Sequence, residues 1–277
     1  MTLKFGTDGV RARAYTELTL ADVERLSAVA ARVLGGDAML IGTDTRESGP
    51  DFVEAVCRGL ARVGMTPWVM GDAPTPAVAR AAAVLDVPAA MISASHNPFH
   101  DNGIKFFAAG GRKLTDDQQA TIEAALADTP ALDRTVEPAP GVDRTDQVTA
   151  YADWVASTLD GRTLEGVRVV VDCANGAASG VAPRVLTDLG ADVVTIHASP
   201  DGRNINDQAG STHMDRLADY VASGSADLGL AFDGDADRLL AVDADGQLVD
   251  GDQIIAICAL DLNARGLLAE ATVVVTV

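Results

Sequence analysis

Aromatic residues are scarce in this sequence: they make up 4% of the 277 residues, whereas hydrophobic residues as a whole make up 48%. A core of this composition is built mostly from alanine, valine and leucine, which suits helices packed on parallel strands. Long apolar runs are also missing, because aspartate, arginine or glycine interrupts each candidate segment, so we predict no membrane span. The N-terminus carries an early lysine, Lys4, and no apolar stretch, so we predict no signal peptide.

Positive charge is in short supply as well. Lysine and arginine number 21 against 40 aspartates and glutamates, which gives a formal net charge of -19. The basic residues are scattered rather than clustered. Because such a surface repels polyanions, we expect neither nucleic acid nor an anionic membrane as a partner.

Cysteine is rare and widely spaced. Cys57, Cys173 and Cys258 lie far apart, their number is odd, and none has the spacing of a metal ligand pair. This usage does not suit a disulfide scaffold. We therefore expect a reducing, cytoplasmic location.

Strand and helix patterns alternate through the first half of the chain. Apolar spacing predicts a helix over residues 20–34, which Gly35 and Gly36 end. Further expected elements are strands at 39–42, 66–70 and 89–92, and helices at 51–63, 76–85 and 115–126. The alternation predicts an α/β fold, with mixed sheets covered by helices.

Residues 128–146 lack periodicity and are predicted to be a connection. After it, helices are expected at 151–159, 181–189 and 214–222, and strands at 167–171, 192–196 and 228–232. A hairpin is expected to join 239–242 to 248–249. The sequence thus predicts two α/β domains, at 1–140 and 141–250.

The last part of the sequence predicts a helix at 251–268 and a β-branched strand at 272–277. One helix and one strand cannot bury their apolar faces alone. We expect that they pack on the second domain, or that 251–277 begins a third α/β domain in a truncated chain.

A polar loop at 94–98 follows the expected strand 89–92. The Asn97-Pro98 pair forces a turn, because proline lacks an amide hydrogen and disfavours helix in the preceding residue. Ser95 therefore lies at a strand end, where open α/β sheets bind ligands, and is a candidate nucleophile. Alternatively, Ser95 and His96 are turn residues that bond their own backbone. The glycine-flanked elbow of serine hydrolases is absent, which disfavours acyl transfer.

An acidic loop follows the expected strand 228–232, with Asp233, Asp235 and Asp237 separated by small residues. Three carboxylates at this spacing can surround one hard cation, which relieves their mutual repulsion. A solvated acidic turn is the alternative. An EF-hand is excluded, since Arg238 and Ala244 occupy the positions that demand glycine and glutamate. A phosphoryl oxygen on Ser95 would suit Mg²⁺ as a shared ligand.

The glycine-rich segment 5–11 (FGTDGVR) contains neither the Gly-Lys-Ser/Thr nor the Gly-x-Gly-x-x-Gly pattern of nucleotide-binding loops. Taken alone, it predicts a turn. Together with 93–98 (SASHNP), 101–107 (DNGIKFF) and 233–238 (DGDADR), however, it resembles the α-D-phosphohexomutases. Segments 170–177, 204–206 and 250–254 resemble the branch of that family that acts on glucosamine phosphates. The resemblance covers essentially the whole sequence in the right order, and small departures occur at Ala12 and Ala236, where glycine is common.

The resemblance implies a chemistry and a set of residue roles. Glucosamine 6-phosphate and glucosamine 1-phosphate would be interconverted through a bound 1,6-bisphosphate, a step toward UDP-N-acetylglucosamine and the bacterial cell wall. Ser95 matches the family's phosphoserine, and it would complete a Mg²⁺ site with the three aspartates of the acidic loop. Arg11 and Lys105 match active-site cations, Lys105 being a candidate proton carrier. His96 and Arg238 match residues lining the site, Arg238 on the substrate side.

The resemblance also leaves alternatives open. A small-molecule sugar phosphate is the expected ligand, yet mannose or glucose phosphates could replace the glucosamine phosphates, and a homodimer is a candidate assembly. The family has four domains, and the sugar-selecting glutamate loop of the third and the Arg-Ser-Gly-Thr segment of the fourth are absent from this sequence. We therefore expect residues 1–277 alone to be nearly inactive, and a non-catalytic metal-binding phosphoprotein is the rival interpretation.

Overall fold

The computed structural model describes residues 3–6, 9–130 and 136–275. Their first sheet has seven strands in the order β1-β5-β4-β2-β3-β7, with β6 beside β5. Pairing is parallel among β4, β2, β3 and β7 and antiparallel among β1, β5, β4 and β6. The elements in chain order are β1 (Val10–Arg13), α1 (Leu20–Leu34), β2 (Ala38–Thr43), α2 (Gly49–Ala61), β3 (Thr66–Asp72), α3 (Thr75–Leu85), β4 (Ala89–Ile92), β5 (Asp101–Ala108), β6 (Arg112–Lys113), α4 (Asp116–Asp128) and β7 (Val142–Asp143).

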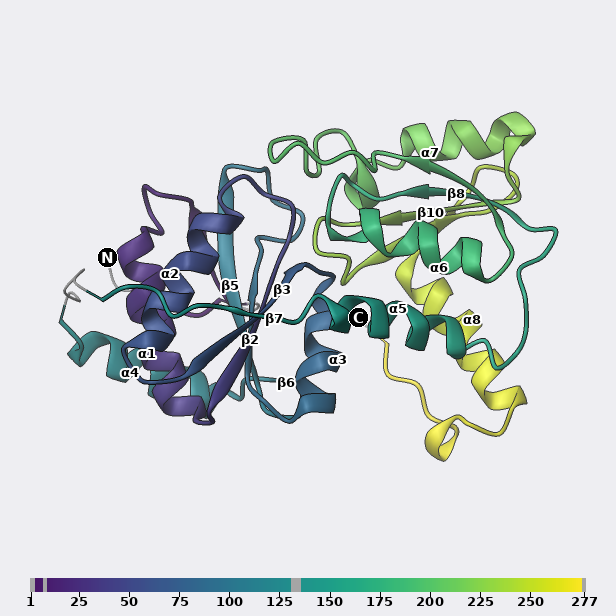
Figure 1. Cartoon of the computed structure of the whole chain (residues 1–277). Helices are drawn as coiled ribbons and strands as arrows, with labels where there is room; N and C mark the ends of the chain where they lie inside the picture. The colour runs from purple at the N-terminus through teal and green to yellow at the C-terminus, as the bar shows by residue number, and fades with distance from the viewer. Residues whose placement is uncertain (1–2, 7–8, 131–135, 276–277) are drawn as a thin grey trace.

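Helices cover both faces of this sheet (Figure 1). Met39 and Ile41 of β2 pack in the cluster of α1, α2 and α4, whereas Leu40 between them packs in the cluster of α3. Every residue of β2 is buried, as expected of a central strand with both faces covered. Helix α1 begins at a capping box between Thr19 and Asp22.

The second sheet has five strands in the order β12-β11-β10-β8-β9, of which β9, β8 and β10 run parallel. Helices α6 and α7 pack in separate clusters on its two faces. The elements are α5 (Asp146–Ser157), β8 (Arg168–Asp172), α6 (Ala182–Asp188), β9 (Asp192–Ile196), α7 (Asp215–Tyr220), β10 (Leu228–Phe232), β11 (Leu239–Val242), β12 (Leu248–Val249) and α8 (Gly251–Ala264). Helix α5 lies between the sheets and packs on both α3 and α6 (Figure 1).

These elements confirm the predicted α/β fold class with mixed sheets. The predicted helix 20–34, the strands 89–92, 192–196 and 228–232, and the hairpin of β11 and β12 are all confirmed. Strands β1 and β5 were not predicted. Strand β7 extends the first sheet to residue 143, beyond the expected boundary at 140.

The predicted strand at 272–277 is wrong for its described part. Residues 272–275 form no strand, because no described strand lies alongside them, and Val274 is 87% exposed. Residues 276–277 lie outside the described residues.

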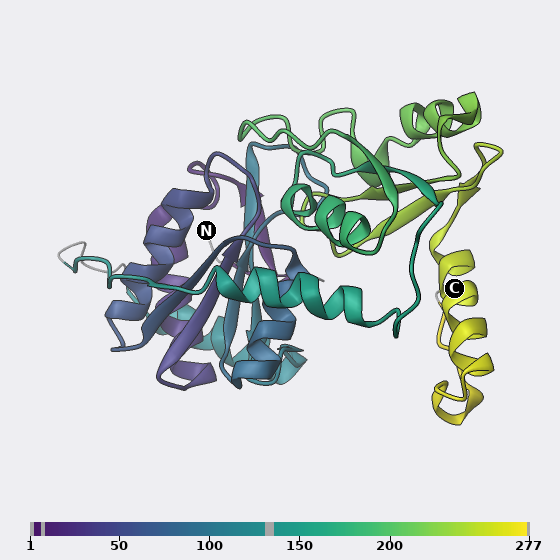
Figure 2. The same ribbon diagram turned by 45° about the vertical axis from the view of Figure 1, so that its right-hand side comes forward.

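Helix α8 buries none of its residues and extends away from the second sheet (Figure 2). Its Ile257 and Leu260 are exposed, and an ion pair from Arg162 to Asp261 ties it to the segment that follows α5. None of the described helices is long and apolar enough to cross a bilayer.

Candidate active site

The loop of residues 94–98, which we call the nucleophile loop, leaves the first sheet at the carboxyl end of β4. Ser95 is 1% exposed and adopts a left-handed backbone conformation with φ of 54°. Its amide donates to Ser93 Oγ at 2.8 Å, and that hydroxyl donates to Asp44 Oδ2 at 2.6 Å. The loop therefore turns inward, and Ser95 points toward the second domain rather than into bulk water.

Residues 233–238, which we call the acidic loop, meet Ser95 from the carboxyl end of β10. Ser95 Oγ donates a 2.6 Å hydrogen bond to Asp233 Oδ2, across 138 positions of sequence. The carboxylate oxygens of Asp233, Asp235 and Asp237 lie within 4.8 Å of one another. The structure thus brings together the predicted nucleophile and the predicted metal ligands from two domains.

Helix α3 provides another contact from the first domain to the acidic loop. Thr75, its first residue, donates its amide to Asp235 O at 2.8 Å and its hydroxyl to Asp235 Oδ2 at 2.7 Å. Asp235 is completely buried, and its other carboxylate oxygen, Oδ1, has no hydrogen-bond partner among the described residues. A buried anionic oxygen without a partner is costly. The three carboxylates therefore fit a hard divalent cation, which would supply the missing contact.

Lys105 is the cation that the chain itself supplies to the acidic loop. Strand β5 pairs it with Met91 of β4, so the strand that returns from the nucleophile loop delivers it. Its Nζ lies 2.8 Å from Asp235 Oδ2 and 3.0 Å from Asp237 Oδ2, and the residue is 5% exposed. Lys105 thus offsets part of the charge of the three carboxylates, and the exposed Arg238 Nε lies 4.0 Å from Asp237 Oδ1.

The two buried carboxyl groups of the acidic loop differ in acidity. Burial, followed by repulsion from Asp235, raises the pKa of Asp233 to about 7. For Asp235, burial acts in the same upward direction, but the charge and hydrogen bonds of Lys105 and the hydroxyl of Thr75 outweigh it and lower the pKa. The proton that relieves the repulsion therefore resides on Asp233, the ligand next to Ser95.

His96 and Arg238 border the nucleophile on the solvent side. His96 Nδ1 lies 3.5 Å from Ser95 Oγ and 3.4 Å from Arg238 Nη1. Burial and the neighbouring guanidinium groups of Arg238 and Arg11 lower the pKa of His96, which favours the neutral imidazole. The Arg238 amide donates to Asp233 Oδ1 at 3.1 Å, while its side chain remains exposed.

An open cavity of about 560 Å³ adjoins the acidic loop. Its lining combines basic side chains with backbone of the glycine-rich segment: Lys4, Gly6, Gly9, Arg11, Lys113, Asp237 and Arg238. Four cations around one opening suit an anionic ligand on a protein whose overall charge is negative. Thr7 and Asp8 of the same segment lie outside the described residues.

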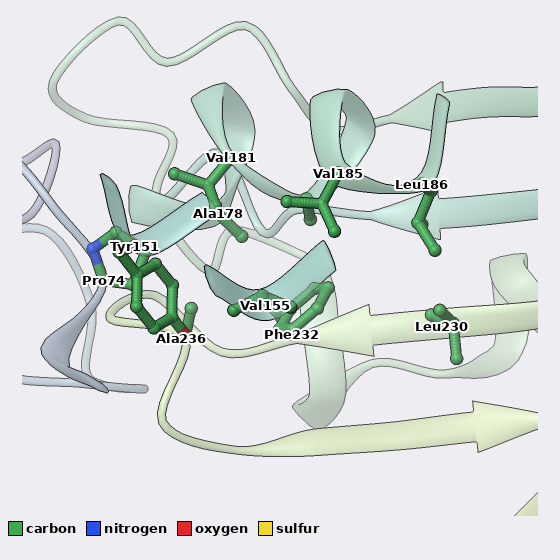
Figure 3. A pocket seen from close by; sticks show the side chains of 11 residues that line it. Pro74, Tyr151, Val155, Ala178, Val181, Val185, Leu186, Leu230, Phe232 and Ala236 are labelled. Carbon is green, nitrogen blue, oxygen red and sulfur yellow. The ribbon is translucent and has the colours of Figure 1, made fainter. Parts of the chain in front are cut away.

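A second cavity, of about 160 Å³, lies behind the acidic loop between α5, α6 and β10 (Figure 3). Pro74, Tyr151, Phe232 and Ala236 are among its lining residues, which are nearly all apolar. Because none of its described lining residues is charged, this cavity does not suit a sugar phosphate.

Four residues near the site were not singled out from the sequence as site residues: Arg46, Thr75, Lys113 and Asn206. Arg46 and Asn206 donate to backbone carbonyls of the nucleophile loop. Arg46 follows β2, a parallel neighbour of β4, at the same sheet edge as Ser95. A charged residue at the carboxyl end of a neighbouring parallel strand was the signal that could have identified it.

Comparison with known proteins gives a consistent result over the whole chain. The family model of phosphoglucomutase/phosphomannomutase alpha/beta/alpha domain I matches residues 2–132, and that of domain II matches residues 148–246. The chain is 49% identical to a phosphoglucosamine mutase of Frankia alni and 51% identical to one of Clavibacter michiganensis, over 100% and 99% of its own length. It spans 64% and 62% of the length of these two relatives.

A solved structure extends the likeness to three dimensions. A phosphoglucomutase/phosphomannomutase family protein from Burkholderia thailandensis superposes with a TM-score of 0.75 at 28% sequence identity. The match covers 95% of this chain and 59% of the other. The likeness therefore concerns the arrangement of both domains.

Proposed function

We propose, because the chain belongs to the phosphoglucomutase/phosphomannomutase family, that it is the phosphoryl-transferring part of a phosphoglucosamine mutase. The single observation that supports this most directly is the 2.6 Å contact between Ser95 Oγ and Asp233 of the acidic loop. Phosphoryl transfer depends on placement and charge neutralisation, and this contact places a hydroxyl beside a cation site.

Mg²⁺ is the proposed cofactor, held by Asp233, Asp235, Asp237 and an oxygen of phosphorylated Ser95. The oxygen-only donor set and the partnerless Asp235 Oδ1 support this choice. When bound, the ion would neutralise charge on the phosphoryl group during transfer.

The chain's own residues would then divide the remaining work. The phosphoryl group leaves Ser95 Oγ for a sugar hydroxyl, which gives a 1,6-bisphosphate, and the proton of that hydroxyl ends on Ser95 Oγ. Lys105 is the proposed carrier of this proton. The reverse step returns the other phosphate to Ser95. Arg11 and Arg238, which line the basic cavity, would hold phosphate of the substrate, and neutral His96 would border Ser95 without adding charge.

Glucosamine phosphates are the proposed substrates because the relatives matched over the full chain carry the name phosphoglucosamine mutase. Mannose and glucose phosphates remain the second candidate, since one solved family member is described by both of those activities.

The decisive experiment uses the full-length protein that contains this segment. After priming with glucose 1,6-bisphosphate, it should convert glucosamine 6-phosphate to the 1-phosphate, and faster than it converts mannose or glucose phosphates. Ser95→Ala should abolish turnover and prevent the gain of one phosphate group in intact mass. Equal turnover by Ser95→Ala would refute the proposed nucleophile. Residues 1–277 assayed in parallel should be nearly inactive in turnover.

A further inference from the structure

We propose that Arg46 and Asn206 are positioning residues that hold the nucleophile loop from two sides, one in each domain, and thereby make the orientation of Ser95 depend on the seating of the second domain. This inference rests on the proposed role of Ser95 as phosphoryl carrier. The two residues act through the backbone of the loop.

Arg46 holds the loop from within the first domain. Its side chain is completely buried, and its Nε pairs with Asp44 at 3.0 Å, which balances its charge. Its Nη2 donates to Ser95 O and to Asn97 O at 2.9 Å each. Its Nη1 donates to Asp101 O at 3.0 Å and also to Pro98 O. One guanidinium thus binds four carbonyls of the loop and its exit, a task that needs a planar fork of several donors.

Asn206 holds the same loop from the second domain. Its Nδ2 donates to Ser95 O at 2.8 Å and to Asn97 O at 3.1 Å, the two carbonyls that also accept from Arg46 Nη2. The backbone of Asn206 is itself fixed, because its main-chain N–H donates a hydrogen bond to Ala174 O at 2.9 Å. Each of the two carbonyls therefore has one donor from each domain.

The acidic loop approaches the nucleophile loop at the same place. A Cβ added to Gly234 would lie 2.6 Å from Ser95 O and 2.8 Å from Asn206 Nδ2. Only glycine permits that approach. The metal ligands and the Asn206 donor thus reach Ser95 side by side, both from the second domain.

The conformation of Ser95 explains why such support is needed. A left-handed backbone is unfavourable for a residue with a Cβ, and the surroundings must stabilise it. Its carbonyl oxygen is directed into buried space, where a missing partner is costly. Loss of either donor should therefore let Ser95 relax from this conformation without unfolding either sheet.

Hydrogen exchange on the 277-residue chain tests the coupling without any activity. In Asn206→Ala, amides of the nucleophile loop should exchange about tenfold faster, because two hydrogen bonds are lost. Exchange in β2, β8 and β10 should be unchanged. The matched control is Thr45→Val, which removes another interdomain hydrogen bond, from Thr45 Oγ1 to Asn175 O at 2.6 Å, without touching the loop.

Kinetics of the full-length protein supply the second readout. Arg46→Lys keeps the charge beside Asp44 but loses the fork, and we expect kcat to fall by about 10²-fold, as for a misplaced reacting group. Asn206→Ala should behave in the same way. KM for the sugar phosphate should stay within about twofold in both, since neither residue lines the basic cavity. Thr45→Val should retain kcat.

The outcomes separate this inference from the proposed function. Unchanged loop exchange in Asn206→Ala, or a raised KM with unaltered kcat, overturns the inference. Faster exchange spread evenly over both domains overturns it too, since that would indicate a general structural role. If the loop exchanges faster as expected while the wild type shows no mutase turnover, the proposed function fails and the two-sided support of the loop stands.

Discussion

The nucleophile loop and the acidic loop have similar backbone settings, but their buried polar groups are satisfied in different ways. Each follows a strand that pairs in parallel, and each contains a non-glycine residue in the left-handed region, Ser95 with φ of 54° and Ala236 with φ of 56°. In the nucleophile loop, the protein supplies hydrogen-bond donors for the inward-facing carbonyls. In the acidic loop, Lys105 lies within ion-pair distance of the buried Asp235, and Asp235 Oδ1 has no hydrogen-bond partner in the described part of the chain.

This difference separates a structural requirement from a ligand requirement. The nucleophile loop should keep its conformation without a divalent cation, because the donors to its carbonyls belong to the chain. The acidic loop should depend on pH and on divalent cations, because protons or a metal must offset the repulsion among its carboxylates.

Removal of the central ligand should have the largest effect. Asp235→Asn should eliminate the rise in Tm on adding Mg²⁺ and lower turnover of the full-length protein by at least about 10²-fold, because the transferring charge loses its counter-ion. Asp245→Asn makes the same chemical change in the exposed turn between β11 and β12 and should leave both quantities unaltered. A full Mg²⁺ response in Asp235→Asn would contradict the metal assignment.

The close approach of the two loops can be broken by one methyl group. Gly234→Ala should lower the free energy of unfolding by about 1–3 kcal/mol, since the new Cβ meets the Ser95 carbonyl within 2.6 Å. Urea unfolding measures this, with Gly180→Ala as the control because a Cβ added at Gly180 meets nothing within 4 Å. Equal stability of the two variants would show that the loops are not in contact.

The pH of the solution should change the affinity of the acidic loop for Mg²⁺. The pKa of Asp233 is raised to about 7, so the folded metal-free protein retains a proton that the unfolded chain releases near its ordinary pKa of 3.8. This carboxyl therefore favours the fold at low pH, and its contribution is lost as pH rises from about 4 through about 7. A metal must displace that proton, so Mg²⁺ affinity should fall by up to about tenfold between pH 8 and pH 6.

Calorimetric titration at the two pH values would measure the difference in Mg²⁺ affinity. Asp233→Asn should abolish most of the pH dependence, whereas a wild-type affinity that is constant from pH 6 to pH 8 would contradict the assignment of the proton.

The exposed interdomain ion pair should have the smallest effect. Arg203 Nε lies 2.6 Å from Glu47 Oε2, yet both side chains are substantially exposed. Arg203→Ala should change the free energy of unfolding by less than about 1 kcal/mol, because water and salt screen such pairs. Urea unfolding at low and high salt checks this, and a loss comparable to that of Gly234→Ala would show that exposed charges rather than buried contacts join the domains.

The sequence predicted the elements with clear apolar patterns and missed those that depend on partners. Helix α1 and strand β4 were predicted with their observed bounds. Strand β5 begins with Asp101, Asn102 and Gly103, which are poor strand formers, and it forms because it pairs with both β1 and β4. The C-terminal segment 272–275 shows the converse, since β-branched residues without a partner form no strand.

The same rule applies to the site. Ser95 and the three aspartates could be identified because their residue types and spacing indicate a chemistry. Arg46 and Asn206 could not be assigned a role, because each acts on backbone carbonyls that no pattern of side chains reveals. Thr75 was not assigned a role either, because Pro76 alone was enough to predict the start of this helix and nothing in the sequence linked Thr75 to the acidic loop.

The strand pairing between β4 and β5 limits how this site can vary in length. Met91 faces Lys105 across the pair, and only residues 93–100 connect the two strands. Arg46 holds several carbonyls within that connection, so the connection cannot accommodate an inserted residue as a local bulge. It would instead shift the register of β5 by one position, which exchanges the faces of all its side chains and turns the lysine into the core, on the face that Ile104 and Phe106 now occupy. Insertions, which surface loops usually tolerate, should therefore be selected against at this point of the chain.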